Sequence, residues 1–122
     1  MDAVVTDCAS CSSFLKGYSS LLADDRKFGE AASGLAAKVL DITELLTRPG
    51  PQETLSDLPL SVTYHAPCHA SRYQDLREEP RAILRSIPGV TLVEMEEADW
   101  CCGGAGAYSF TQPDLAQKIL DR

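Results

Sequence analysis

The sequence predicts an α/β fold, in which a small parallel sheet of about three strands is flanked by helices. Three short runs rich in Val and Thr have strand length, at residues 3–6, 60–64 and 90–95. Segments with apolar residues at helical spacing separate these runs. Strands that alternate with helices along a chain form parallel βαβ units, which is the basis of the predicted class.

Helices are expected after each strand. Two helical patterns follow the first strand, with apolar positions at Phe14, Leu15, Tyr18, Leu21 and Leu22 in one and Leu35, Val39, Ile42 and Leu46 in the other. A third helix is expected to start around Pro80 and to stop at Pro88-Gly89. A last helix follows Thr111, whose spacing from Asp114 resembles a capping box.

The chain is long enough for one domain of ordinary size. Residues 49–59 (PGPQETLSDLP) have the composition of a linker or surface loop. This loop separates residues 1–48 from residues 60–122, and we expect the two parts to form one compact domain.

Composition and charge exclude several classes of protein. The hydrophobic fraction of 44% and the charged fraction of 24% are typical of soluble globular proteins. The formal net charge of −7 lacks the electrostatic footprint of a nucleic-acid binder. No apolar run approaches the about 20 residues that span a membrane, and the first residues do not resemble a signal peptide. We therefore expect a cytoplasmic protein with no nucleic-acid partner and no transmembrane segment.

Five cysteines are the most informative feature of the sequence: Cys8, Cys11, Cys68, Cys101 and Cys102. An odd number without an export signal argues against a disulfide framework. Clustered cysteines in a cytosolic chain bind metal or carry out redox chemistry, whereas a small buried hydrophobe is the usual role of a scattered one. All five follow expected strands, whose carboxyl ends meet at one edge of a parallel sheet. We expect the last three to lie within about 10 Å of each other at this edge.

The residues around the cysteines suit an iron–sulfur or zinc site. Gly103 and Gly104 let the backbone come close and direct N–H groups toward anionic sulfur, although an ordinary strand-to-helix turn would also use them. His65 and His69 flank Cys68. Capping and packing at a turn is the favoured interpretation of both histidines, and the alternative is a ligand role or a hydrogen bond to sulfur.

The cysteine segments resemble a known family. His65-Ala-Pro-Cys68-His69 and Cys101-Cys102-Gly103-Gly104, separated by the 32 residues 69 to 100 between Cys68 and Cys101, resemble the cysteine-rich CCG domain. This domain occurs in a subunit of heterodisulfide reductase, in the iron–sulfur subunit of glycolate oxidase and in lactate-utilisation iron–sulfur proteins. The segment from Glu97 through the Cys-Cys-Gly motif is most similar to the glycolate oxidase subunits.

The resemblance implies that residues 1–48 end a first CCG module with Cys8-x-x-Cys11 and that residues 60–122 begin a second. Both would belong to a larger pseudo-symmetric unit. Only 122 − 102 = 20 residues follow Cys102, which is too few to reach a closing Cys-x-x-Cys, so we expect a piece of a longer protein. In that parent the five cysteines would be metal ligands, and the cofactor-binding set would be Cys68, Cys101, Cys102, Gly103 and Gly104. The implied cofactor is a non-cubane 4Fe–4S cluster, which we do not expect in this piece alone; zinc is the alternative metal.

The resemblance also implies a function. The parent would be a non-catalytic electron-transfer subunit of a glycolate or lactate oxidase complex. It would take electrons from a flavin-containing partner subunit and pass them to a quinone or another carrier. A further subunit and peripheral association with the inner face of the membrane would fit this complex. A structural zinc-binding assembly module, a heterodisulfide-reductase-like subunit and a thioredoxin-type dithiol at Cys8-x-x-Cys11 are the alternatives.

Overall fold

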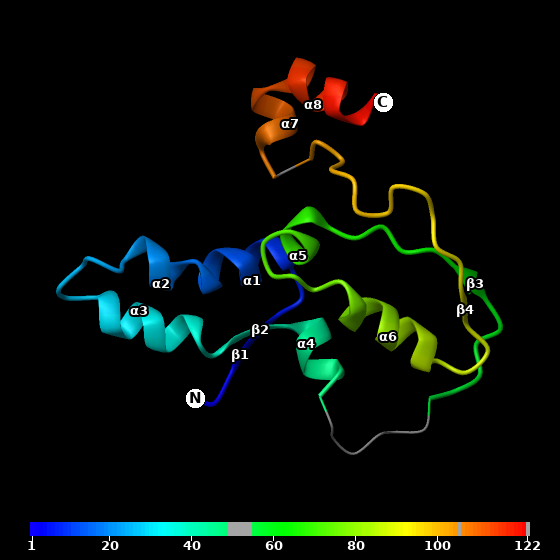
Figure 1. The fold of residues 1–122 in the computed structure, drawn as a ribbon, viewed down its shortest axis with the longest axis horizontal. Helices are drawn as coiled ribbons and strands as arrows, with labels where there is room; N and C mark the ends of the chain where they lie inside the picture. The colour runs from blue at the N-terminus through cyan, green and yellow to red at the C-terminus, as the bar shows by residue number, and fades with distance from the viewer. Residues whose placement is uncertain (49–54, 105, 122) are drawn as a thin grey trace.

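The structure is a computed structural model that describes residues 1–48, 55–104 and 106–121. Its strands form two separate parallel pairs, β1 (Val4–Thr6) with β2 (Val39–Asp41) and β3 (Ser61–Val62) with β4 (Thr91–Leu92) (Figure 1). The α/β class with small parallel sheets is therefore confirmed. The strands are divided between two pairs, rather than gathered in one sheet of about three, and each pair joins strands that follow one another along the chain.

The first strand pair is connected by helices α1 (Ala9–Lys16), α2 (Tyr18–Leu21) and α3 (Gly29–Ala36). Helices α2 and α3 lie side by side as an antiparallel hairpin, so the chain returns to place β2 next to β1 (Figure 1). A short helix, α4 (Ile42–Leu46), follows β2 without an intervening loop.

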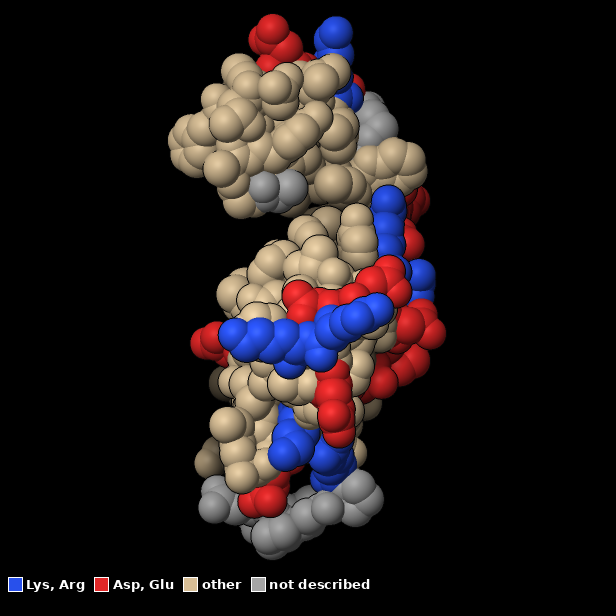
Figure 2. Space-filling model, turned by 90° about the vertical axis from the view of Figure 1, so that its left-hand side faces the viewer, with Lys and Arg blue, Asp and Glu red and all other residues tan. Residues whose placement is uncertain are grey.

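The second pair is connected by α5 (Cys68–Ser71) and α6 (Glu78–Ser86). After β4 the chain runs through an irregular segment to α7 (Tyr108–Thr111) and α8 (Pro113–Leu120). These two helices form a hairpin at one end of the molecule, and Figure 2 shows it as a lobe whose visible surface is mostly uncharged. No helix in the described ranges is long and apolar enough to cross a lipid bilayer.

Strand β2 occupies residues for which the apolar spacing predicts a helix. Val39, Leu40 and Asp41 are all buried, and they pair in register with β1. A strand buried on both faces has a continuous apolar run, which periodicity alone does not distinguish from a buried helix. The predicted helix through this segment is therefore wrong at β2.

Of the helix starts expected at Pro80 and Thr111, the structure confirms the first and not the second. Pro80 lies in the first turn of α6 and Gly89 follows this helix with a φ of 79°, as the sequence predicts. The capping box at Thr111 is wrong, because Gln112 caps α8 and makes no side-chain cap hydrogen bond. The Thr111 hydroxyl instead donates to the Ala107 carbonyl within the preceding helix, at 3.2 Å. Of the expected linker, residues 49–54 lie outside the described residues, and residues 55–59 have no regular structure.

A capping box forms at Asp41, which ends β2 and caps α4. The Asp41 carboxylate accepts hydrogen bonds from the Thr43 backbone N–H at 3.0 Å and from the Ser12 hydroxyl at 3.1 Å. The Glu44 carboxylate accepts the Asp41 backbone N–H at 2.8 Å. Asp41 and Ser12 are both buried, so this carboxylate joins β2, α4 and the first turn of α1.

Replacing this carboxylate should destabilise the fold. Asp41→Ala removes the helix cap and the hydrogen bond that joins Ser12 to the end of β2, and it leaves the Ser12 hydroxyl only the local Cys8 and Ala9 carbonyls as acceptors, so we expect the free energy of unfolding to fall by about 2 kcal/mol. Asp24→Ala is the matched control, because Asp24 is exposed and should change stability by less than about 0.5 kcal/mol. Urea unfolding followed by circular dichroism measures both. Equal stability of the two variants would contradict the structural role of Asp41.

Candidate functional site

The first cysteine pair lies at the start of α1. Cys8 is the N-cap residue, with extended φ and ψ of −115° and 112°, and Cys11 lies in the first turn. Both thiols are exposed. The Cys8 carbonyl accepts the Ser12 backbone N–H at 3.0 Å, so the helix begins at this residue.

The two thiols of this pair have different proton affinities. The Cys11 backbone N–H and thiol, which hydrogen-bond Cys8, lower the pKa of Cys8. The same interaction raises the pKa of Cys11, and the charge on Cys8 raises it further. The Cys8 thiol therefore loses its proton more readily than the Cys11 thiol.

The second group comes from two segments. Cys68 is the first residue of α5, and Cys101 and Cys102 lie in the irregular segment before α7. Burial raises the pKa of the Cys68 thiol, and its hydrogen-bonded neighbour Cys101 raises it further. Cys102 has a smaller effect on the same thiol. The fold therefore brings Cys68 and Cys101 together, with Cys102 nearby.

Gly103 and Gly104 shape the backbone at this second group. Gly103 has a φ of 70°, and its backbone N–H donates to the Cys101 sulfur at 3.4 Å. A Cβ atom on Gly103 would lie 2.6 Å from the Ala116 carbonyl of α8, whereas one on Gly104 would lie 3.2 Å from the Cys102 sulfur. Gly103 therefore provides both the left-handed turn and the close approach of α8 to the cysteine segment.

The two histidines that flank Cys68 in the sequence make different contacts. The His65 Nε2 atom lies 2.9 Å from the Trp100 carbonyl oxygen, immediately before Cys101. The His69 Nδ1 atom lies 3.2 Å from the Ser10 hydroxyl and 3.7 Å from the Cys68 sulfur. His65 therefore supports the backbone of the second cysteine group, and His69 lies between the two groups.

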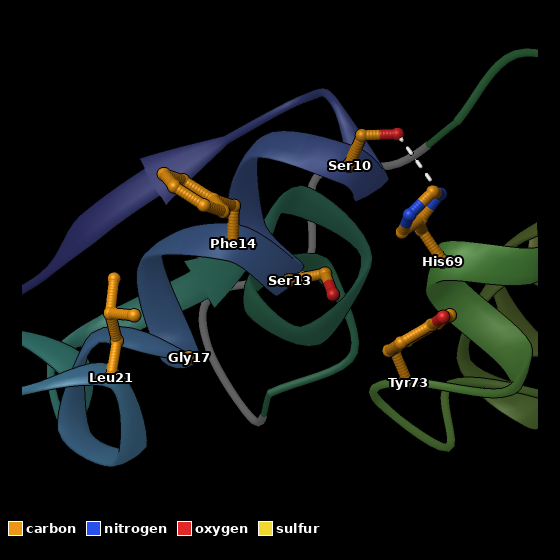
Figure 3. A pocket seen from close by; sticks show the side chains of 7 residues that line it. All are labelled: Ser10, Ser13, Phe14, Gly17, Leu21, His69 and Tyr73. Carbon is orange, nitrogen blue, oxygen red and sulfur yellow. Dashed lines mark hydrogen bonds between the residues drawn. The ribbon is translucent and has the colours of Figure 1, made fainter. Parts of the chain in front are cut away.

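An open groove of about 560 Å³ lies between α1 and α5 next to His69 (Figure 3). Its lining combines hydroxyl, aromatic and aliphatic groups, from Ser10, Ser13, Phe14, Gly17, Leu21, His69 and Tyr73. The His69 and Tyr73 rings stack at 5.0 Å between centroids, and the Ser10–His69 hydrogen bond crosses from one side of the groove to the other (Figure 3).

Gln74 is a positioning residue that no sequence pattern identifies. Its side-chain N–H₂ donates to the Ala9 and His69 carbonyls at 3.0 and 3.1 Å and lies 3.0 Å from the Ser12 hydroxyl. Gln74 therefore ties the helix of the first cysteine pair to the helix that begins with Cys68. Hydrophobic periodicity does not mark such a residue, because its partners in α1 lie 62 and 65 residues away.

The structure brings the five cysteines together in a different way from the expected single sheet edge. The strands belong to two separate pairs, so the five cysteines share no single edge; Cys68 and the Cys101-Cys102 segment follow β3 and β4, whose carboxyl ends lie at one edge of a parallel pair. Packing of α1 against α5 brings the first cysteine pair toward Cys68 instead. Among residues 1–48, 55–104 and 106–121, no group of three or more His, Cys, Asp or Glu side chains is placed to hold one metal ion. The arrangement is therefore two thiol pairs, and the metal-ligand roles stay a prediction.

Comparison with known proteins identifies a family and several relatives. Residues 62–122 match the family CCG, described as a cysteine-rich domain. The chain is 37% identical to a "probable glycolate oxidase iron-sulfur subunit" of Bacillus subtilis over 99% of its own length and 28% of the relative. It is 36% identical to a subunit of the CoM/CoB fumarate reductase of Methanothermobacter marburgensis over 97% of the chain and 22% of the relative. It is 33% identical to lactate utilization protein A of Geobacillus thermodenitrificans over 98% of the chain and 51% of the relative.

The chain therefore spans between about a fifth and a half of the length of these relatives. No solved structure matches the chain.

Substitution of Gly103 should disturb the cysteine segment more than substitution of Gly106. Both glycines have positive φ, but a Cβ on Gly106 meets no heavy atom of the described residues within 4 Å. We expect Gly106→Ala to cost about 1 kcal/mol from backbone strain alone. Gly103→Ala adds a clash with α8 and should cost about 3 kcal/mol. Urea unfolding tests this difference, and equal losses would show that the contact with α8 does not restrict Gly103.

Alkylation should distinguish Cys8 from Cys11 in the metal-free chain. Because its pKa is lowered, Cys8 should react with iodoacetamide at lower pH than Cys11, whose pKa is raised. Cys8→Ala removes the hydrogen bond that raises the Cys11 pKa and should shift Cys11 alkylation to lower pH. Mass spectrometry of the alkylated peptides over a pH series measures both effects. Reaction of Cys11 before Cys8 would contradict this assignment.

Proposed function

This chain belongs to the CCG family of cysteine-rich domains, and we propose that it is part of an iron–sulfur electron-transfer subunit of a 2-hydroxy-acid oxidase. The observation that carries the proposal is the approach of Cys68 to Cys101, two thiols that come from separate segments. Cys102 directly follows Cys101 and is exposed, so a third thiol is nearby, although the described side chains do not converge on one point. A structural role for a single buried cysteine would not need this arrangement.

The side chains present suit an iron–sulfur cluster in their chemistry. Thiolates are the usual ligands of such clusters, and Cys68, Cys101 and Cys102 would supply them. The cluster, when bound, supplies one-electron redox chemistry. The Gly103 N–H lies 3.4 Å from the Cys101 sulfur, where it would stabilise negative charge on that atom. Cys68 and Cys101 are half-buried, whereas Cys102 is exposed.

Cys8 and Cys11 would be ligands of a different metal site from that of Cys68, Cys101 and Cys102. We assign residues 1–48 to the end of one CCG module and residues 60–122 to the beginning of the next, joined by residues 49–59. In the longer protein each cysteine group would then be completed by thiols from outside this chain. The two thiol pairs support this division, because Cys8 and Cys11 lie at the start of α1, whereas Cys68 begins α5 and Cys101 lies in the segment before α7.

The names of the relatives support a proposal for the substrate and the partners. Their names include a glycolate oxidase iron-sulfur subunit and lactate utilization protein A, which supports glycolate or lactate as the electron donor. A flavin-containing subunit would oxidise the donor, and the iron–sulfur subunit would carry electrons to a quinone or another carrier. A cytoplasmic complex at the inner face of the membrane would suit this role. This chain would contribute no catalytic residue to the oxidation.

Metal analysis of the anaerobically purified full-length protein tests the proposal. We expect iron and acid-labile sulfide, together with the visible absorption of sulfur-to-iron charge transfer. Zinc in their place, with no visible absorption, would contradict electron transfer and indicate a structural zinc module.

Loss of a single proposed ligand should stop electron transfer in the full complex. Cys68→Ser, Cys101→Ser and Cys102→Ser each remove a thiolate bond and its charge, so we expect loss of iron and of acceptor-coupled turnover. The flavin subunit, assayed with an artificial acceptor, should still oxidise the donor. His69→Ala should retain most iron, because we assign a packing role to His69, whose Nδ1 atom lies 3.7 Å from the Cys68 sulfur. Wild-type iron and turnover in the Cys101 and Cys102 variants would rule out the ligand assignment.

A further inference from the structure

Three consecutive backbone carbonyls before Cys101 are held by the segment that contains Cys68. The Ala98 carbonyl accepts the Ala66 backbone N–H at 2.7 Å. The Asp99 carbonyl accepts the Arg72 guanidinium at 3.1 Å, and the His65 Nε2 atom lies 2.9 Å from the Trp100 carbonyl. Residues 98–100 are therefore fastened at every peptide unit to residues 65–72.

Arg72 connects the two cysteines most directly. Its backbone N–H donates to the Cys68 carbonyl at 2.9 Å, at the end of α5. Its guanidinium reaches the Asp99 carbonyl, two residues before Cys101. Arg72 therefore links the backbone of Cys68 to the backbone that leads into Cys101.

The chemistry of the guanidinium suits this role. It keeps its charge at all pH values that a protein tolerates, and hydrogen bonds from a charged donor are stronger than neutral ones. Arg77 offers a contrast on the same segment, since it pairs with the Asp99 carboxylate, at 3.6 Å, rather than with the Asp99 carbonyl. Both contacts are exposed, but the Arg77 side chain is shared between the Asp99 and Asp75 carboxylates, at 3.6 and 3.2 Å, and such pairs contribute little, whereas the Arg72 bond ends on the backbone itself at 3.1 Å.

We propose that Arg72 is a positioning residue that holds Cys101 beside Cys68, with His65 supporting the same backbone. That this distance between Cys68 and Cys101 serves to bind a metal rests on the proposed function. That Arg72 controls the distance does not depend on it. Without the Arg72 bond, the backbone contact at Ala98 remains, but the two residues that lead into Cys101 lose one of their two anchors.

Thiol cross-linking in the metal-free chain tests the proposal. In a background where Cys8, Cys11 and Cys102 are Ser, only Cys68 and Cys101 remain, and dibromobimane becomes fluorescent when it bridges two nearby thiols. We expect Arg72→Gln to lower the cross-linking rate about fivefold, because a charged hydrogen bond is lost. Arg72→Lys, which keeps the charge and part of the reach, should restore part of the rate. Arg77→Gln is the matched control and should stay within about twofold of the parent.

A second background separates positioning from general folding. There Cys68, Cys101 and Cys102 are Ser, and Cys8 and Cys11 are cross-linked instead. We expect Arg72→Gln to leave this rate unchanged. An unchanged Cys68–Cys101 rate, or equal loss at both pairs, would overturn the proposal. Because no metal is present, a failure of the iron–sulfur assignment in the full-length protein would be seen separately from a failure of this positioning role.

Discussion

The connection between α1, which carries Cys8 and Cys11, and the helix that begins with Cys68 depends on one buried hydroxyl, that of Ser12. This side chain directly follows Cys11, is fully buried, and donates to the Asp41 carboxylate at the end of β2. The Gln74 amide lies 3.0 Å from the same oxygen and holds the Ala9 and His69 carbonyls as well. The start of α1 is thereby attached on one side to the first strand pair and on the other to the helix that begins with Cys68. Such polar contacts carry much of the positioning because the buried apolar residues in the described part of the chain are mostly small: Ala32, Val39, Leu40, Ala66, Ala70, Leu76 and Ala116.

Features that depend on local chemistry can be predicted from the sequence. Val- and Thr-rich runs indicate β1, β3 and β4, Pro80 and Gly89 mark the limits of α6, and the glycine after Cys102 marks a left-handed turn. Strand β2 cannot be distinguished from a helix, because its residues are buried on every side. The spacing of Asp41 and Glu44 has the form of a capping box and is the one local signal that could locate this boundary.

Contacts between distant segments cannot be predicted in the same way. Arg72 and Gln74 lie in a stretch without a periodic pattern, and their partners are backbone carbonyls or a hydroxyl at separations of up to 65 residues. A carbonyl carries no signature of residue type, so the sequence contains no sign of which side chain will reach it. The position of the thiols after strands predicts that they gather, although helix packing, and not a shared sheet edge, brings α1 toward α5.

The proposed role of the second cysteine group, Cys68, Cys101 and Cys102, is to bind iron and sulfide through its thiolates. X-ray absorption at the iron and zinc K edges of the anaerobically purified full-length protein tests it most directly, because the method identifies the metal and its ligand atoms together. We predict an iron edge with sulfur neighbours, and a loss of that signal in Cys101→Ser. A zinc edge with sulfur neighbours and no iron would contradict the claim.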